Sequence, residues 1–146
     1  MFVTWHVHCY LKCQHRRAKV MLSMFTILIA DKNKNVREFL RREFMDEGYS
    51  VKLVKDGPEL LRSILENPAP DLLICDLELP YANGLDSLEK LVAAQPHLPI
   101  VIYSFLTELS NHKVVKRAAA FLEKRGNDID SLKETVAKVL GNHYSG

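Results

Sequence analysis

The sequence lacks the features that would place it in or across a membrane. No apolar run in its 146 residues approaches the roughly 20 residues that a membrane-spanning helix needs, and the N-terminus lacks the uninterrupted apolar core of a secretory signal. An excess of one charge is also missing, since 20 Lys and Arg stand against 18 Asp and Glu. We therefore expect a cytoplasmic protein, with no membrane partner and no nucleic acid partner.

Cysteine is scarce, and three residues are too few for a disulfide framework. Cys75 lies inside an apolar run and is predicted to be structural, because a buried cysteine behaves as a small hydrophobic residue. The other two cysteines fall in the histidine-containing stretch "HVHCYLKCQH" (6–15). Its spacing matches no established metal motif, so zinc binding is not expected there.

The first 23 residues differ in composition from the rest and show no sustained hydrophobic period. Two explanations stay open: a disordered terminus, and an extension upstream of the native start. The stretch "RRAKV" could be the translation of a purine-rich ribosome-binding sequence, which leaves Met1, Met21 and Met24 as candidate start residues. We expect one domain over 24–141 and a short tail at 142–146.

Beyond this segment, short apolar runs alternate with longer segments of helical period. The apolar runs predict strands at 25–30, 49–54, 71–76, 99–104 and 119–124. Three of them are apolar at successive residues, which is typical of strands buried on both faces. The helical period predicts helices at 33–48, 56–67, 83–95 and 128–140, and a weaker one at 107–117 that should be short or mobile.

Five such strand-helix units predict an α/β fold with a doubly wound parallel sheet and helices on both faces. The expected strand order is 2-1-3-4-5, with the more mixed second and fifth strands at the edges. Sites in such sheets lie outside the carboxyl ends of the strands, at the switch in strand order. The residues that follow the strands are therefore candidate site residues.

Two acids, a hydroxyl and an ammonium group follow these strands. Asp31 follows the first strand, Asp76 the third, Ser104 ends the fourth and Lys124 ends the fifth. Since the first and third strands are neighbours, Asp31 and Asp76 should face each other. An aspartate in such a position can act as a carboxylate nucleophile, and a nearby lysine can stabilise a transferred phosphoryl group.

With these residues at the strand ends, residues 25–140 resemble the receiver domain of bacterial two-component response regulators, which has a flavodoxin-like fold. The stretch "DLLICDLELPYANGLDSL" (71–88) is similar to the phosphoacceptor segment of that family. The resemblance implies that Asp76 is the phosphoacceptor, that Lys124 is the family lysine, and that Ser104 and Phe121 are the switch residues. Phe121 is equally well explained as a core residue.

The resemblance also implies a Mg²⁺ site formed by Asp31, Asp76 and the backbone of Glu78. The family usually has a second acid, itself a metal ligand, where this chain has Lys32. Replacing an acid by a base lowers the attraction for a divalent cation, so Mg²⁺ binding is expected to be weak or absent.

Three fates of Lys32 remain open. Its ammonium could lie between Asp31 and Asp76 as a fixed cation that partly replaces the metal and still allows phosphotransfer. The same ion pair could instead satisfy Asp76 permanently, or the side chain could turn out to solvent.

The resemblance implies a single-domain receiver that is not an enzyme beyond assisting its own phosphotransfer. It would accept a phosphoryl group from a sensor histidine kinase or phosphotransfer protein. It would then act on an unidentified protein through the face of its fourth helix, fifth strand and fifth helix, and a homodimer stays open. This face departs from the family pattern: the stretch from Ser104 to Lys124 is short, and Arg125 stands where a proline is usual.

The sequence has two rival interpretations of its function. The first is a pseudo-receiver adaptor that works without phosphorylation, because Lys32 replaces a metal-binding acid. The second is a nucleotide-binding protein of the same fold, which is disfavoured because no glycine-rich loop follows the first strand.

Overall fold

The computed structural model describes residues 24–80, 84–125 and 129–145, so the N-terminal segment predicted as an extension lies outside the described residues. The chain forms a five-stranded parallel sheet in the order β2-β1-β3-β4-β5. The strands are β1 (Thr26–Ala30), β2 (Ser50–Val54), β3 (Leu72–Cys75), β4 (Ile100–Ser104) and β5 (Ala120–Glu123). The predicted strand order is confirmed, and so is the placement of β2 and β5 at the edges.

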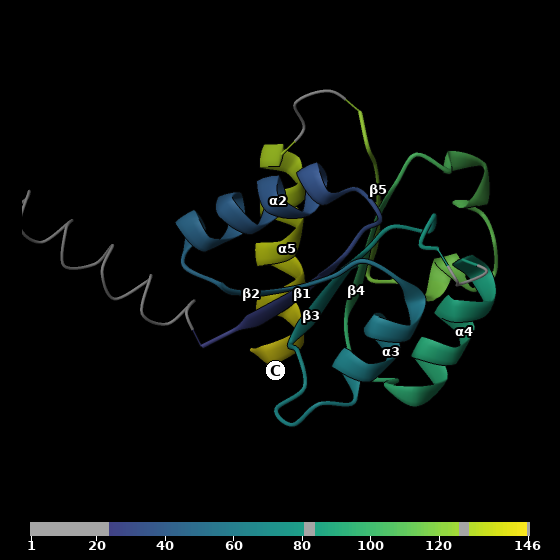
Figure 1. Cartoon of the computed structure of the whole chain (residues 1–146), viewed down its shortest axis with the longest axis horizontal. Helices are drawn as coiled ribbons and strands as arrows, with labels where there is room; N and C mark the ends of the chain where they lie inside the picture. Colours follow the sequence, from purple (N-terminus) through teal and green to yellow (C-terminus); the bar gives the residue numbers. More distant parts are fainter. Residues whose placement is uncertain (1–23, 81–83, 126–128, 146) are drawn as a thin grey trace, which may run out of the picture.

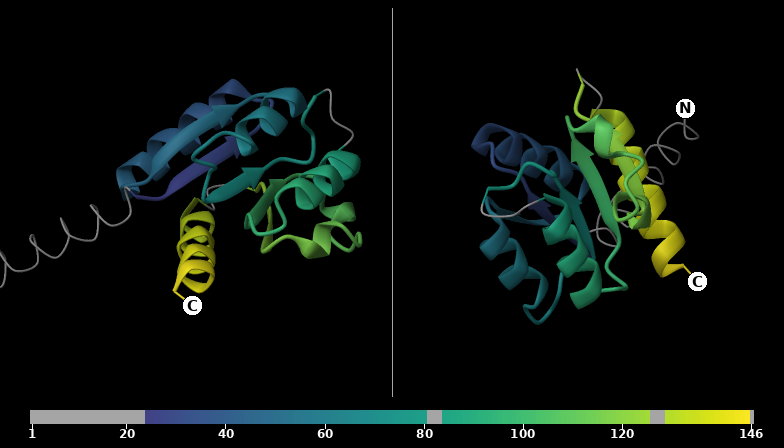
Figure 2. Two further views of the ribbon diagram at one scale, coloured as in Figure 1. Left: turned by 90° about the horizontal axis from the view of Figure 1, so that it is seen from below. Right: turned by 90° about the vertical axis from the view of Figure 1, so that its right-hand side faces the viewer.

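Helices cover both faces of this sheet. Helices α2 (Lys34–Glu47) and α5 (Ile129–Tyr144) lie on one face, and α3 (Gly57–Ile64) and α4 (Gly84–Ala94) on the other (Figure 1). Figure 2, right, shows strands of the sheet between α5 and the α4 side of the molecule. None of the helices in the described ranges is both long enough and apolar enough to span a membrane.

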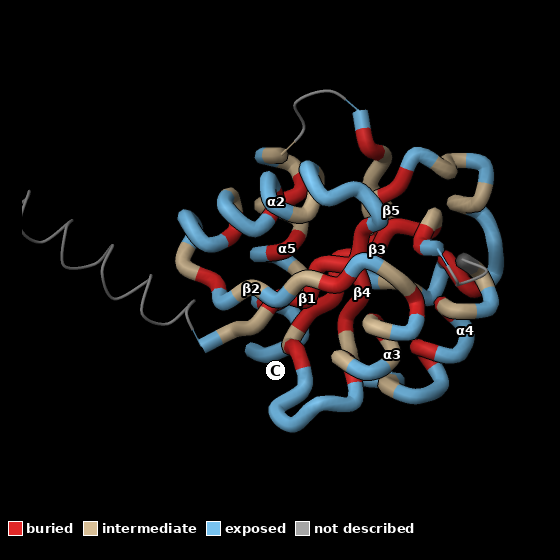
Figure 3. Tube along the Cα trace, in the orientation of Figure 1, coloured by how far each residue is buried: buried red, intermediate tan, exposed pale blue. Residues whose placement is uncertain are grey.

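The core is divided by the sheet into two halves, because successive strand residues point to opposite faces. Ile27 and Ile29 pack with Phe44 of α2 and Val136 of α5, whereas Leu28 belongs to the cluster on the α3 and α4 side. Buried residues concentrate along the central strands, and the outer sides of the helices are exposed (Figure 3). This explains why β1, β3 and β4 are apolar at successive positions.

Local signals set the ends of α2, the helix that follows the site loop after β1. Asn33 is its N-cap, and the side-chain oxygen accepts hydrogen bonds from the amides of Asn35 (2.9 Å) and Val36 (3.4 Å). Gly48 ends the helix with φ of 107°, a left-handed conformation in which a side chain is strained. The cap leaves only a short connection between β1 and α2, so Asp31 and Lys32 are held at the mouth of the sheet.

The segment 107–117, predicted as a short or mobile helix, contains no α-helix. It forms two single 3₁₀ turns, η1 (Thr107–Leu109) and η2 (Val115–Arg117). Val114 and Val115 are its buried residues, which is too little apolar surface for a packed amphipathic helix. The face formed by this segment, β5 and α5 therefore carries two 3₁₀ turns in place of the weak helix that the sequence predicted.

Candidate functional site: two buried aspartates around one lysine

The sheet register brings Asp31, Asp76 and Lys124 together. Strands β1 and β3 are paired in parallel with Ala30 opposite Cys75, so the next residue of each strand, an aspartate, lies at the same edge. Lys124 follows β5, and its Nζ donates to Asp31 Oδ2 and, at 2.7 Å, to Asp76 Oδ2. One ammonium group thus bridges the two carboxylates.

These three charged groups are almost fully removed from solvent. The exposed fractions are 2% for Asp31, 3% for Asp76 and 6% for Lys124. Burial by itself lowers the pKa of Lys124, but the hydrogen bonds and negative charges of Asp31 and Asp76 outweigh it, so that its pKa is raised above the ordinary value. The lysine is therefore charged at neutral pH and is held in place by both acids.

The remaining carboxylate oxygens are also occupied. Asp31 Oδ1 accepts a hydrogen bond from the Asn33 amide at 2.8 Å, and Asp76 Oδ1 accepts one from the Glu78 amide at 3.1 Å. In the described part of the chain, every buried side-chain nitrogen or oxygen has a hydrogen-bond partner. Each side-chain oxygen of Asp31 and Asp76 therefore already accepts a hydrogen bond from within the protein.

Lys32 does not occupy the position that two of the three hypotheses gave it. Its Nζ lies 3.5 Å from Glu78 Oε1, its side chain is 52% exposed, and the position between the aspartates is held by Lys124. The expectation of a fixed Lys32 cation between Asp31 and Asp76 is therefore wrong for this structure. The lysine instead forms a surface ion pair at the rim of the site.

Arg37 is a site-forming residue that the sequence did not reveal. Its Nη1 donates to the carbonyl oxygens of Asp31 at 2.7 Å and Lys32 at 3.0 Å. From the first turn of α2 it therefore clamps the loop that carries both residues. An arginine on a predicted helix has many surface roles, so no sequence signal identified this one.

Ser104 lies at the end of β4 as predicted and is fully buried. Its Oγ accepts a hydrogen bond from the Leu106 amide at 3.2 Å, and the hydroxyl keeps its own hydrogen for another acceptor. Phe121 is half-buried and packs against the core cluster on the α3 and α4 side. The switch roles of both residues stay predictions.

Two aromatic rings flank the bridging lysine. Lys124 Nζ lies 5.6 Å from the ring centroid of Tyr103 and 5.7 Å from that of Phe105, within the range of cation–π attraction. Phe105 is 61% exposed although it is a large apolar residue. It places an aromatic side chain at the surface directly beside the buried ionic cluster.

Cys75 is buried directly behind the phosphoacceptor candidate. Burial, and secondarily the charges of Asp76 and Asp31, raise its pKa to about 12. A thiol with such a pKa is a poor nucleophile, which agrees with the predicted structural role.

The arrangement offers no preformed Mg²⁺ site. Mg²⁺ requires several oxygen ligands in octahedral geometry, usually carboxylates, carbonyls and water. The two aspartates already share the Lys124 ammonium, and within the described ranges no cluster of three His, Cys, Asp or Glu side chains could hold a metal ion. With the Lys124 ammonium held between them, the two carboxylates in this arrangement do not fit the ion.

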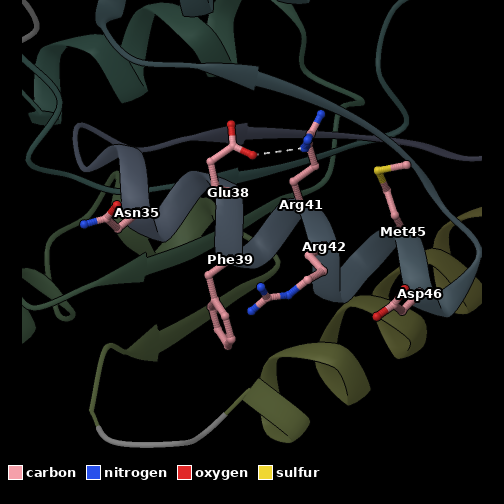
Figure 4. A pocket seen from close by; sticks show the side chains of 7 residues that line it. All are labelled: Asn35, Glu38, Phe39, Arg41, Arg42, Met45 and Asp46. Atoms are coloured by element: carbon pink, nitrogen blue, oxygen red, sulfur yellow. Dashed lines mark ion pairs between the residues drawn. The ribbon is translucent and has the colours of Figure 1, made fainter.

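A hollow of about 460 Å³ lies on the outer surface of α2. Figure 4 shows its described lining residues, with the exposed side chains of Phe39 and Met45 among charged groups. The Arg42 guanidinium lies 5.8 Å from the Phe39 ring centroid, and Arg41 pairs with Glu38 at 3.3 Å. We call Phe39, Arg41, Arg42 and Met45 the α2 face. The helix that carries it begins at Lys34, shortly after Asp31 and Lys32.

The doubly wound sheet carries two acids at its switch point and a lysine that bridges them, the arrangement from which the sequence predicted a receiver domain. Residues 27–137 match the response regulator receiver domain family. This match spans most of the chain, and the protein therefore belongs to that family.

Relatives of known sequence are longer than the aligned region. The response regulator MprA of Mycobacterium sp. (strain KMS) is 38% identical over 76 residues, which is 52% of this chain and 33% of MprA. MprA of Mycobacterium avium (strain 104) gives the same identity over the same shares. The aligned part thus spans about a third of the curated relatives it matches.

Solved structures agree over more of the chain. The response regulator TrrA of Thermotoga maritima, in complex with Mg²⁺-BeF, has a TM-score of 0.72 and 28% identity, over 79% of this chain and 98% of TrrA. TrrA in complex with the histidine kinase ThkA has a TM-score of 0.72 over 80% of this chain and 98% of TrrA. The receiver fold predicted from the sequence is confirmed.

Proposed function

We propose that this chain acts as a receiver in phosphorelay signalling, with Asp76 as the phosphoacceptor. The observation that carries the proposal is the Asp76 carboxylate at the end of β3, with the Lys124 ammonium 2.7 Å from its Oδ2. An Asp76 oxygen attacks phosphorus, the bond to the donor's leaving group breaks, and the Lys124 charge stabilises the phosphoryl oxygens. The chain assists this transfer to itself and turns over no other substrate.

The proposed phosphodonor is a sensor histidine kinase or a phosphotransfer protein. TrrA, which shares the fold, is found in complex with the histidine kinase ThkA. The α2 face supports a protein donor, because Phe39 and Met45 expose apolar surface next to two arginines on a helix that begins at the site. A cytoplasmic location, where the two proteins could meet, also stays a prediction.

The output is proposed to run through Ser104 and Phe121. A phosphoryl group on Asp76 offers new acceptor oxygens, and the buried Ser104 hydroxyl can donate to one of them. Moving Ser104 would pull on the η1 segment that follows it, and so alter the face formed by η1, η2, β5 and α5. This face is the proposed contact for a downstream protein or for a second copy of the chain.

A pseudo-receiver adaptor is the second candidate function. It is favoured by the burial of Asp76, which is 3% exposed, and by the hydrogen bonds that its oxygens already accept from Lys124 and from the Glu78 amide. In that case the buried cluster would fix one conformation of the domain and phosphate would never bind covalently.

Phosphorylation by a small acyl phosphate separates the two candidates. The full chain and its Asp76→Asn variant are incubated with acetyl phosphate and Mg²⁺ and followed by intact mass. The receiver proposal expects one added phosphoryl group on the wild type and none on the variant. An unmodified wild type under all conditions, with a folded circular dichroism spectrum, would leave the adaptor as the function.

A further inference from the structure

Lys32 and Glu78 form an ion pair whose side chains are partly exposed, while their backbones are hydrogen-bonded to residues of the site. The pair spans 3.5 Å, with side-chain exposures of 52% and 31%. Arg37 holds the Lys32 carbonyl at 3.0 Å, and the Glu78 amide donates to Asp76 Oδ1 at 3.1 Å. A partly exposed ammonium is thus paired with Glu78, whose amide donates to the carboxylate that we assign as the nucleophile.

The pair itself contributes little to the stability of the fold. Exposed ion pairs stabilise a fold only weakly, because solvent screens them and two long side chains must be ordered. The Lys32 ammonium can therefore exchange its partner Glu78 for a more strongly charged one at low cost. Lys124, by contrast, is buried and shared between two aspartates.

Phosphorylation would create such a partner. The carboxylates of Asp31, Asp76 and Glu78 stand against the ammonium groups of Lys32 and Lys124, three negative charges against two positive, which leaves one net negative charge. A phosphoryl group on Asp76 adds about one more negative charge and three acceptor oxygens. Of the two lysines in this cluster, Lys32 is the one with room to move.

We propose that Lys32 acts as a second, movable cation of this site. Its ammonium group would break the ion pair with Glu78 and form one with the phosphoryl group, so that transfer from an acyl phosphate needs no divalent cation. This inference rests on the proposed function. In the step, an Asp76 oxygen forms a bond to phosphorus, the bond between phosphorus and the acyl oxygen breaks, and the carboxylate of the donor leaves with the bonding electrons. Lys124 and Lys32 together balance the charge on the phosphoryl oxygens.

The role of Glu78 follows from the same geometry. In the resting protein it competes for the Lys32 ammonium, so it slows the transfer by the strength of the ion pair. Removing its charge should release the lysine and accelerate phosphorylation about two- to fivefold, the range that a surface ion pair supports.

The test compares initial rates of phosphorylation by acetyl phosphate, read by intact mass, in a chelator and in Mg²⁺. The proteins are the wild type, Lys32→Gln, Glu78→Gln, and the control Lys34→Gln, which removes the same charge from an exposed residue two positions away. We expect the wild type and Lys34→Gln to react equally fast in chelator, and Lys32→Gln to react about tenfold more slowly. Lys32→Asp, which places a third carboxylate in the cluster, should react only with Mg²⁺.

The failure of this inference is distinguishable from failure of the proposed function. A wild type that reacts in Mg²⁺ but not in chelator would overturn the movable cation and leave Asp76 as the phosphoacceptor. Equal rates for Lys32→Gln and Lys34→Gln in chelator would do the same. No reaction of the wild type with or without Mg²⁺ would overturn both.

Discussion

Replacing Lys124 by methionine should destabilise the domain strongly, because it leaves two buried carboxylates facing each other. Both Oδ2 atoms bond to the same Nζ, so they lie within about 6 Å of one another. Two unit charges at about 5 Å repel by about 3 kcal/mol at an effective dielectric constant near 20. This agrees with the 3–5 kcal/mol that breaking a buried ion pair typically costs, about half of the stability of an average domain.

The assay is urea unfolding at pH 7, followed by circular dichroism. Lys52→Met is the matched control, because it removes a lysine from an exposed pair with Glu66 and should cost less than about 1 kcal/mol. The double variant Lys124→Met with Asp31→Asn should recover part of the loss, since one of the repelling charges is gone. A Lys124→Met variant no less stable than Lys52→Met would refute the reasoning.

The pH dependence of the same variants gives a second readout. In Lys124→Met, one buried carboxyl should take up a proton more readily in the folded than in the unfolded state, so the destabilisation should shrink as the pH falls. In the wild type the pKa of Lys124 is raised in the folded state. Its contribution is therefore fully present below the unfolded value of about 10.4 and is lost as the pH rises through the folded value.

Two further predictions concern glycine and cysteine positions. Gly48→Ala should lower the free energy of unfolding by about 1–2 kcal/mol, because the residue has a left-handed φ of 107°. Gly141→Ala should raise it by up to about 1 kcal/mol, because nothing lies within 4 Å of the added Cβ and alanine favours the helix. The reverse order in urea melts would contradict this account of α2 and α5. In a Cys9→Ser, Cys13→Ser variant, the remaining thiol of Cys75 should react with a disulfide reagent only as fast as the protein unfolds, because burial raises its pKa to about 12. Rapid labelling of the native variant would show that Cys75 is not sealed in the core.

The sheet was predictable because its strands carry a strong signal. Continuous apolar runs mark β1, β3 and β4 as buried on both faces, and the strand order then places Asp31 beside Asp76. The approach of Lys124 followed from the same reasoning about strand ends, since the lysine ends the fifth predicted strand. The strands, their order and the residues at their ends depend on backbone topology, which hydrophobic patterns in the sequence predict well.

The features that could not be predicted depend on side-chain choices between competing partners. By sequence, Lys32 had two acceptable positions, between the two aspartates or out in solvent, and the structure pairs it with Glu78, an acid from a different loop. The Arg37 clamp requires knowing that the first turn of α2 faces back over the loop. In the segment 107–117, apolar residues were too few to decide between a helix and 3₁₀ turns.

The central claim, that Asp76 accepts a phosphoryl group, is tested most directly by locating the modification. The chain is treated with acetyl phosphate, the acyl phosphate is trapped with borohydride, which converts the modified aspartate to homoserine, and the peptides are sequenced by mass spectrometry. We predict homoserine at position 76 in the wild type and unmodified aspartate at position 31. Modification at Asp31 or elsewhere, or no modification under any condition, would contradict the account.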